Sequence, residues 1–223
     1  MFAGLDQQVF LWLNSDRALP WLDTAWAVLS SFDLWLPFLI LAGLIVAWRG
    51  GFRARAMLVC LLLSVGIMES AIIGPLKRAF DRDRPRYVVE GARFIDLAAV
   101  KPRILAIGLP LQIVPTDTSI APPEAGRSFP SGHTGNMFCF ATVLAAFYRW
   151  RGAVFFVVAT LVALSRVATG AHWPSDVVLT AALSIACTAA LLALYAALWR
   201  RLAPRVAPSL AAKHTELLSG PAR

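Results

Sequence analysis

Long apolar stretches separated by short basic turns constrain this chain more than any other feature. Apolar runs occupy residues 34–48, 57–76, 134–148, 152–168 and 175–199. A helix needs about 20 apolar residues to cross the roughly 30 Å of bilayer hydrocarbon. The chain is 58% hydrophobic and 15% charged, whereas soluble domains carry about a quarter charged residues. We therefore predict an all-α fold, a polytopic membrane helical bundle with about five to six spanning helices.

The chain divides into three parts along its length. Residues 1–20 include the short amphipathic stretch LDQQVFLWLN, which predicts an N-terminal interfacial helix. Residues 21–199 form the membrane domain, with a polar insertion at 78–129 that is long enough to be functional. Residues 200–223 are a basic tail that we expect to be loosely ordered. The pattern leaves open whether residues 21–33 span the membrane or insert halfway.

Basic residues in the short loops set the expected orientation. The net charge of +8 could suggest nucleic acid, but the arginines flank apolar runs, where anchoring to lipid headgroups explains them better. We expect the bilayer and a lipid as partners, and no nucleic acid. The arginines at 49–55, 149–151 and 200–205 would share the cytoplasmic side under the positive-inside rule. The insertion then lies outside, which in a bacterial inner membrane is the periplasm.

Three polar clusters interrupt this apolar pattern, at residues 77–85, 130–133 and 165–176. The predicted topology places all three at one membrane face. Lys77, Arg84 and Arg166 supply cations that neutralise a phosphate, and arginine offers a two-pronged match to its oxygens. Ser131 and Gly132 precede an apolar run, where the free N–H groups of a helix N-terminus favour an anion.

Two histidines and a carboxylate complete the set. Phosphoryl transfer through a covalent intermediate needs a nucleophile and a proton donor, and His133 and His172 can supply both. Asp176 follows His172 by four residues, about one helical turn, so its carboxylate can fix the tautomer of the imidazole.

These clusters resemble the type-2 phosphatidic acid phosphatase superfamily in its membrane branch. Lys77, Arg84 and Pro85 match its first motif, residues 130–133 (Pro-Ser-Gly-His) match its second, and residues 165–176 match its third. The resemblance implies a phosphohistidine at His172, oriented by Asp176, with His133 protonating the leaving group. It also implies no metal and no cofactor. The phosphate-binding residues that it implies are Lys77, Arg84, Arg166, Ser131 and Gly132.

The resulting hypothesis is a membrane lipid phosphatase with its site at the outer face. Undecaprenyl diphosphate is the favoured substrate. Lipid A 1-phosphate, phosphatidylglycerophosphate and phosphatidate stay open, as does transfer of the phosphate to an acceptor lipid. The intact motifs argue against a non-catalytic transporter or scaffold. The sequence does not fix the oligomeric state.

Several polar residues lie outside the fixed motif positions. Glu69 falls within a predicted span, where an acid is a functional candidate. Asn136, one turn after His133, could reach the same pocket. The remaining charges of the first cluster are predicted to face solvent or headgroups, and His214 to face solvent: these are Arg78, Asp81, Arg82, Asp83 and His214.

Overall fold

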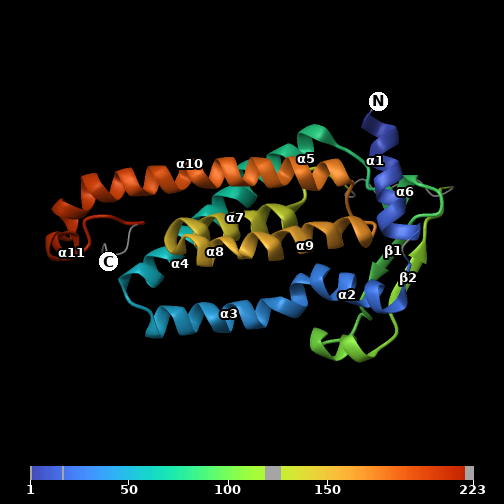
Figure 1. Ribbon diagram of the computed structural model, residues 1–223, viewed down its shortest axis with the longest axis horizontal. Helices are drawn as coiled ribbons and strands as arrows, with labels where there is room; N and C mark the ends of the chain where they lie inside the picture. Colours follow the sequence, from blue (N-terminus) through green and yellow to red (C-terminus); the bar gives the residue numbers. More distant parts are fainter. Residues whose placement is uncertain (1, 17, 119–126, 219–223) are drawn as a thin grey trace.

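The computed structural model describes residues 2–16, 18–118 and 127–218. Those parts of the N-terminal segment, the insertion and the tail that fall on residues 1, 17, 119–126 and 219–223 lie outside the described residues. Long helices dominate, as predicted. Figure 1 shows them running side by side, with small elements gathered at one end of the bundle and the C-terminal helix at the other.

The helices of the bundle follow the predicted runs closely. The second run is one continuous helical segment of three parts, whose middle part has π-helical geometry. In the fourth run, a single helical turn precedes the main helix. The elements are α3 (Phe32–Arg49), α4 (Phe52–Ile67), η2 (Met68–Ile73), α5 (Gly74–Phe80), α7 (Gly132–Tyr148), α8 (Trp150–Ala153), α9 (Phe155–Ala168) and α10 (Pro174–Val206).

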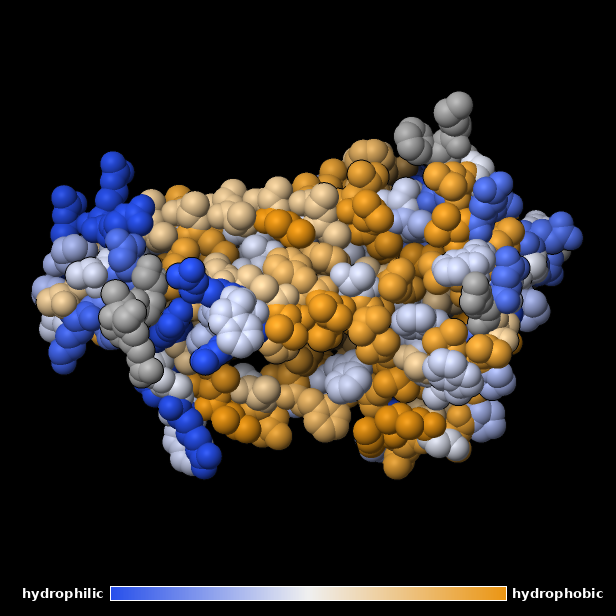
Figure 2. All heavy atoms as spheres, viewed as in Figure 1, coloured by the Kyte–Doolittle hydropathy of each residue, from blue (hydrophilic) through white to orange (hydrophobic). Residues whose placement is uncertain are grey.

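An apolar belt surrounds the bundle. Within the described residues, four helical segments are long and apolar enough to cross a membrane: 32–49, 52–80, 150–168 and 174–206. The α7 helix has 17 residues and lies among them, which completes a bundle of about five crossings. Figure 2 shows hydrophobic side chains over the middle of the molecule and hydrophilic ones toward both ends. The chain is therefore an integral membrane protein.

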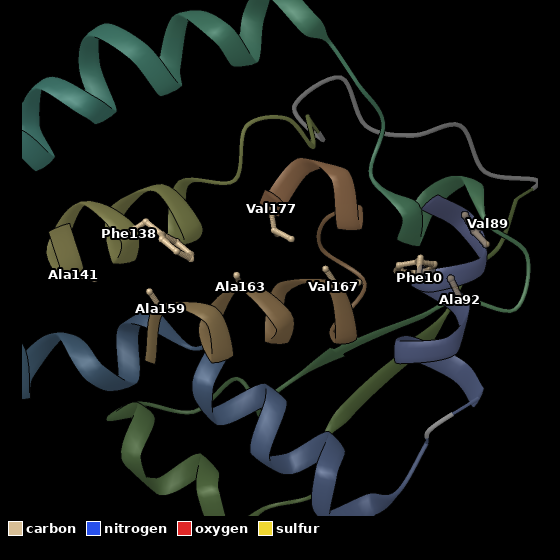
Figure 3. Close-up of a cluster of buried hydrophobic side chains, with 9 residues drawn as sticks. All are labelled: Phe10, Val89, Ala92, Phe138, Ala141, Ala159, Ala163, Val167 and Val177. Carbon is tan, nitrogen blue, oxygen red and sulfur yellow. The ribbon is translucent and has the colours of Figure 1, made fainter. Parts of the chain in front are cut away.

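The core sits around α7, which packs against α4, α9 and α10. Small side chains such as Ala141, Ala159 and Ala163 let these helices approach closely. Figure 3 shows that this cluster continues to Phe10 of the N-terminal helix at the far end. The bundle and the N-terminal helix thus share one apolar core, and this ties the N-terminal helix to the spans.

The N-terminal helix that the sequence predicted lies at one end of the bundle, together with elements that the apolar pattern did not reveal. Helix α1 (Phe2–Leu11) continues into the π-helical η1 (Trp12–Asp16) and lies across the ends of α9 and α10 (Figure 1). The insertion holds a short helix, a 3-10 helix and a two-stranded antiparallel sheet, in which Phe94 is opposite Val114. These elements are α6 (Pro85–Val88), β1 (Arg93–Asp96), η3 (Arg103–Gly108) and β2 (Gln112–Pro115).

The first apolar stretch divides into two helices, and the break between them falls at Ser31. Helix α2 (Pro20–Ser30) has only 11 residues and packs against α9. Its Asp23 is buried and accepts a 2.8 Å hydrogen bond from Nη1 of Arg93 on β1. Of the two helices, only α3 is long enough to span, so α2 is a short helix that packs beside α9 and β1.

The C-terminal tail is more ordered than its composition predicts. Helix α10 extends to Val206, and α11 (Pro208–Lys213) follows directly. His214 was expected to face solvent, but its ring stacks on Phe52 at 4.1 Å between centroids. Its carbonyl also accepts a hydrogen bond from Nε1 of Trp199. Aromatic contacts with the start of α4 and the end of α10 therefore hold this segment in place.

Candidate active site

The three polar clusters meet at the end of the bundle where α1 lies. The first lies at the end of α5 and in the turn to α6, the second at the start of α7, and the third in the turn from α9 to α10. The charges of Lys77, Arg84 and Arg166 all act on the imidazole of His172. Residues that are 89 positions apart in the sequence thus share one site.

The second cluster forms the N-terminus of α7. Ser131 is fully buried and is the N-cap residue, since its hydroxyl accepts hydrogen bonds from the main-chain N–H of Thr134 at 3.4 Å and from its side chain at 3.0 Å. A Cβ atom on Gly132 would lie 3.7 Å from the Glu69 carboxylate and 4.0 Å from Nζ of Lys77. The absence of a side chain here leaves the helix end open toward Lys77.

Arg166 reaches from the end of α9 to the junction of α2 and α3. Its Nη1 donates to the hydroxyl of Ser30 and, at 3.3 Å, to the Ser30 carbonyl. Its Nε is buried without a hydrogen-bond partner among the described residues. A buried guanidinium with an N–H group that has no partner is well suited to bind an anion. Ser30 carries no sequence signal for this contact.

His172 occupies the tight turn between α9 and α10. The turn closes because Ala171 and His172 both donate main-chain hydrogen bonds to the Arg166 carbonyl, at 3.0 and 3.1 Å. The side chain is 2% exposed. Burial, then the positive charges of Arg166, Arg84 and Lys77, hold the pKa of His172 well below its ordinary value of 6.5. The imidazole is therefore neutral at pH 7 and has a free nitrogen lone pair.

Gly170 shapes the same turn through its backbone. Its φ angle is +78°, a left-handed conformation that favours glycine. A Cβ atom at this position would lie 2.4 Å from the Arg93 carbonyl and 3.3 Å from Cβ of Arg86. Any side chain would therefore push β1 and α6 away from the site.

Asp176 lies near His172 without reaching hydrogen-bonding distance. Its Oδ2 is 4.0 Å from Nδ1 of His172, and that nitrogen has no hydrogen-bond partner among the described residues. The carboxylate instead accepts hydrogen bonds from Nη1 of Arg82 at 2.6 Å, from the Ser128 hydroxyl and from the Trp173 N–H at 3.0 Å. Contacts of this kind often tighten only when substrate binds.

Arg82 differs from its predicted role. It was expected to face solvent or headgroups, but it bridges three elements. Its Nη2 is 2.7 Å from Asp6 of α1, its Nη1 contacts Asp176 and Ser175 of α10, and its guanidinium lies over the Trp173 ring. The sequence carried no signal for this role, because the partners lie 76 and 94 positions away.

His133 and Arg84 complete the set. His133 follows Gly132 on α7 and packs edge-on against Phe32 at the start of α3. Arg84 is the N-cap residue of α6, and its Nε donates to the Arg127 carbonyl at 3.3 Å. Burial, then the charge of Arg86, lower the pKa of Arg84. Asn136 has a buried side-chain oxygen without a hydrogen-bond partner among the described residues.

The donor set does not resemble a metal centre. No three His, Cys, Asp or Glu side chains gather as potential ligands within residues 2–16, 18–118 and 127–218. The side chains that converge are mainly cationic, which suits an anion. That the reaction needs neither metal nor cofactor stays a prediction.

The fold and the site together define a helical membrane protein with a cationic, histidine-containing pocket at one end of its bundle. The sequence profile of the PAP2 superfamily matches residues 53–200, so the chain belongs to this superfamily. YbjG of Escherichia coli (strain K12), a proposed undecaprenyl-diphosphatase, is 29% identical over 181 residues, 79% of this chain and 75% of YbjG.

Two further relatives are informative. The crystal structure of Aquifex aeolicus LpxE aligns with a TM-score of 0.57 and 26% identity, over 83% of this chain and 93% of LpxE. The lipid A 1-phosphatase of Porphyromonas gingivalis is 37% identical over 65 residues, which is 27% of this chain and 15% of that protein. The predicted family and fold class are confirmed.

Proposed function

We propose that this chain, a lipid phosphatase of PAP2 type, removes phosphate from a membrane lipid through a phosphohistidine on His172. The observation that carries the proposal is a buried imidazole, with Nδ1 4.0 Å from the Asp176 carboxylate, in a pocket that also holds the cations Lys77, Arg84 and Arg166. A neutral imidazole can attack phosphorus, and the cations stabilise the charge on the equatorial oxygens during transfer.

In the proposed first step, a nitrogen of His172 forms a bond to phosphorus while the bond from phosphorus to the leaving oxygen breaks. His133, at the start of α7, donates a proton to that oxygen. The imidazole becomes positively charged in this step, and its other nitrogen donates a hydrogen bond to Asp176. For this, the 4.0 Å distance between that nitrogen and Oδ2 of Asp176 must shorten. Water then attacks the phosphohistidine and releases inorganic phosphate.

The remaining site residues bind the phosphate in this proposal. Lys77, Arg84 and Arg166 neutralise the phosphate oxygens. Gly132 supplies a main-chain N–H group at the N-terminus of α7. The hydroxyl of Ser131 is occupied as the helix N-cap, so its contribution to phosphate binding is through holding the start of α7 in place.

Undecaprenyl diphosphate is the favoured substrate, because the relative proposed to act on it aligns over most of both chains. Lipid A 1-phosphate is the second candidate, supported by the P. gingivalis relative. Phosphatidylglycerophosphate and phosphatidate fit the same chemistry, and so does transfer to an acceptor lipid in place of water.

The site is proposed to face the periplasm across a bacterial inner membrane. Three short basic segments lie at the end of the bundle opposite the site (Figure 1): the turn from α3 to α4, the turn from α7 to α8, and the end of α10. Arginines there favour the cytoplasmic side. A cysteine placed at Arg78 should then react with a membrane-impermeant thiol reagent from the outside, and one placed at Arg151 should not.

Phosphate release by the detergent-purified protein tests the function. The four candidate lipids are assayed separately with EDTA present, and His172→Ala is the control. We expect release from undecaprenyl diphosphate that survives EDTA and is abolished by the substitution, while the variant keeps its helical content. A fully active His172→Ala protein would overturn the proposal. Release that requires an acceptor lipid would favour phosphotransfer.

A further inference from the structure

A cleft of about 290 Å³ opens beside the proposed site. His133 and Arg166 line it on the site's side. Thr169 and Arg86 of α6 also line it, and the rest of its wall comes from the junction of α2 and α3, from β1 and from η3, elements that are not part of the sequence motifs. Because His133 is the proposed proton donor, the cleft lies on the side from which the leaving group departs.

Two further arginines, Arg86 and Arg103, line this cleft. They differ in whether a carboxylate pairs with the guanidinium. Nη2 of Arg103 is 2.8 Å from Asp96, and its Nη1 donates to the Ala98 carbonyl. Arg86 has no carboxylate partner within 4.0 Å among the described residues. The Nε of Arg86 is buried without a hydrogen-bond partner in that part of the chain. Arg86 therefore brings to the cleft a positive charge that no carboxylate within 4.0 Å balances, while the exposed Asp33 lines the same cleft without pairing with it.

Arg86 is also held firmly in place. Its main-chain N–H donates to the Gly170 carbonyl at 3.3 Å, and its own carbonyl accepts from the Thr116 hydroxyl at 2.9 Å. The guanidinium lies 4.2 Å from the centroid of the Phe94 ring, and Nη2 donates to the Tyr87 hydroxyl. A guanidinium fixed in this way loses little conformational entropy when it binds an anion.

A cation that no neighbouring carboxylate pairs with, placed beside a phosphate site, favours a substrate with a second negative group. Arg86 is close enough to Arg84 and Arg166 to act on both of their charges. Placing three guanidinium groups together costs free energy unless more than one anionic group offsets them. A lipid diphosphate supplies two adjacent phosphoryl groups, whereas a phosphomonoester supplies one.

We infer that Arg86 and this cleft bind the phosphoryl group that stays on the lipid, so that the site is built for lipid diphosphates. This inference rests on the proposed function. His172 bonds to the terminal phosphorus, the bond to the bridging oxygen breaks, and its electron pair leaves on the lipid monophosphate. The second pKa of a phosphate is about 6, so this leaving group departs as an anion that Arg86 stabilises. An alkoxide from a monoester is a far stronger base than this phosphate, so it must take its proton from His133.

A pair of substrates that share one lipid chain tests the inference: farnesyl diphosphate and farnesyl monophosphate. With Arg86→Gln, we expect kcat/KM for the diphosphate to fall about 10- to 100-fold and that for the monophosphate to change less than about 3-fold. Arg78→Gln is the matched control, because Arg78 is exposed on α5 and its loss removes the same charge from the same end. We expect it to leave both substrates unchanged.

Equal losses on both substrates, or no loss on the diphosphate, would overturn the inference. Arg86→Lys keeps the positive charge but loses the two-pronged donor geometry of the guanidinium. It should therefore retain more of the preference for diphosphate than Arg86→Gln does. If Arg86→Gln does not fold, Arg86→Lys decides the question. A preference for diphosphate over monophosphate in Arg86→Lys that equals that of the unmodified protein counts against the inference. Failure of the proposed function looks different: the unmodified protein would release phosphate from neither substrate, or His172→Ala would keep its activity.

Discussion

Arg82 donates a 2.6 Å hydrogen bond to Asp176, the carboxylate that the sequence motif pairs with His172. Asp176 is fully buried, and its Oδ2 is 4.0 Å from the imidazole. The same guanidinium contacts Asp6 of the N-terminal helix at 2.7 Å. The position of the proposed orienting carboxylate therefore depends on a residue outside the motif and on the docking of α1.

Replacing Arg82 by Gln should lower turnover without removing phosphate binding. The substitution leaves two buried carboxylates without their cation, so Asp176 moves and His172 loses its orientation. We expect kcat to fall by about 10-fold and the free energy of unfolding by about 1–2 kcal/mol, a value kept low because Arg82 is 35% exposed. Steady-state kinetics and thermal unfolding in detergent measure both. Arg78→Gln is the control, and an Arg82→Gln enzyme with unchanged kcat would exclude this positioning role.

Arg84→Gln should move the acid limb of the pH–rate profile. Burial and then the charges of Arg166, Arg84 and Lys77 hold the pKa of His172 below 6.5, so the imidazole stays unprotonated and nucleophilic below that pH. Removing one cation raises this pKa, and the acid limb of kcat/KM shifts toward higher pH. Profiles of both proteins on one substrate compare the limbs directly, because the titration of the substrate is common to both. A limb that stays in place would mean that Arg84 does not act on His172.

The same histidine should make the fold sensitive to acid. Its pKa is below 6.5 in the folded protein and near 6.5 in the unfolded chain, so the unfolded chain binds a proton first as the pH falls. Stability is therefore full above about pH 7 and declines progressively below about 6.5. Tm measured from about pH 7 to pH 5 should fall less steeply in His172→Gln. Parallel curves for the two proteins would show that other groups cause the acid sensitivity.

The spans, and the turns that carry the motifs, could be predicted from the sequence because both depend on local patterns. Apolar length specifies a spanning helix, and Gly170 or Pro174 marks a turn or a helix start from one position alone. The roles of Arg82, Arg86 and Ser30 could not be read this way. From the sequence, an arginine next to a span is interpreted as a headgroup anchor. Only the fold shows whether a carboxylate from a distant part of the chain pairs with it. The hairpin of β1 and β2 was missed because its two strands have only four residues each.

Asn14 should prove essential to the stability of the end of the bundle that holds the proposed site. The side chain is fully buried, and its Nδ2 donates to the carbonyls of Arg93 and Ala168, both at 2.8 Å. Its Oδ1 accepts from the Arg93 N–H. Asn14→Ala leaves these main-chain groups unsatisfied beside the His172 turn, so we expect a loss of about 2–4 kcal/mol. Thermal unfolding tests this, with Thr24→Ala as the control, since the Thr24 hydroxyl makes only an exposed hydrogen bond to the Pro20 carbonyl. Equal Tm values for Asn14→Ala and the unmodified protein would contradict the role.

Glu69 should weaken the binding of phosphate in the resting enzyme. It lies in the π-helical segment η2, and its carboxylate faces the open N-terminus of α7 at Gly132, close to Lys77. π-Helical segments often occur at functional sites. A carboxylate beside an anion-binding site also competes with the anion for the same cations. Glu69→Gln should therefore lower the inhibition constant for inorganic phosphate by about 2- to 5-fold, an effect kept small because Glu69 is exposed. Glu216→Gln is the matched control, since Glu216 pairs with Arg200 on the tail side of the bundle. Weaker inhibition in Glu69→Gln would reverse the assignment, because it would mean that Glu69 holds Lys77 in its binding position.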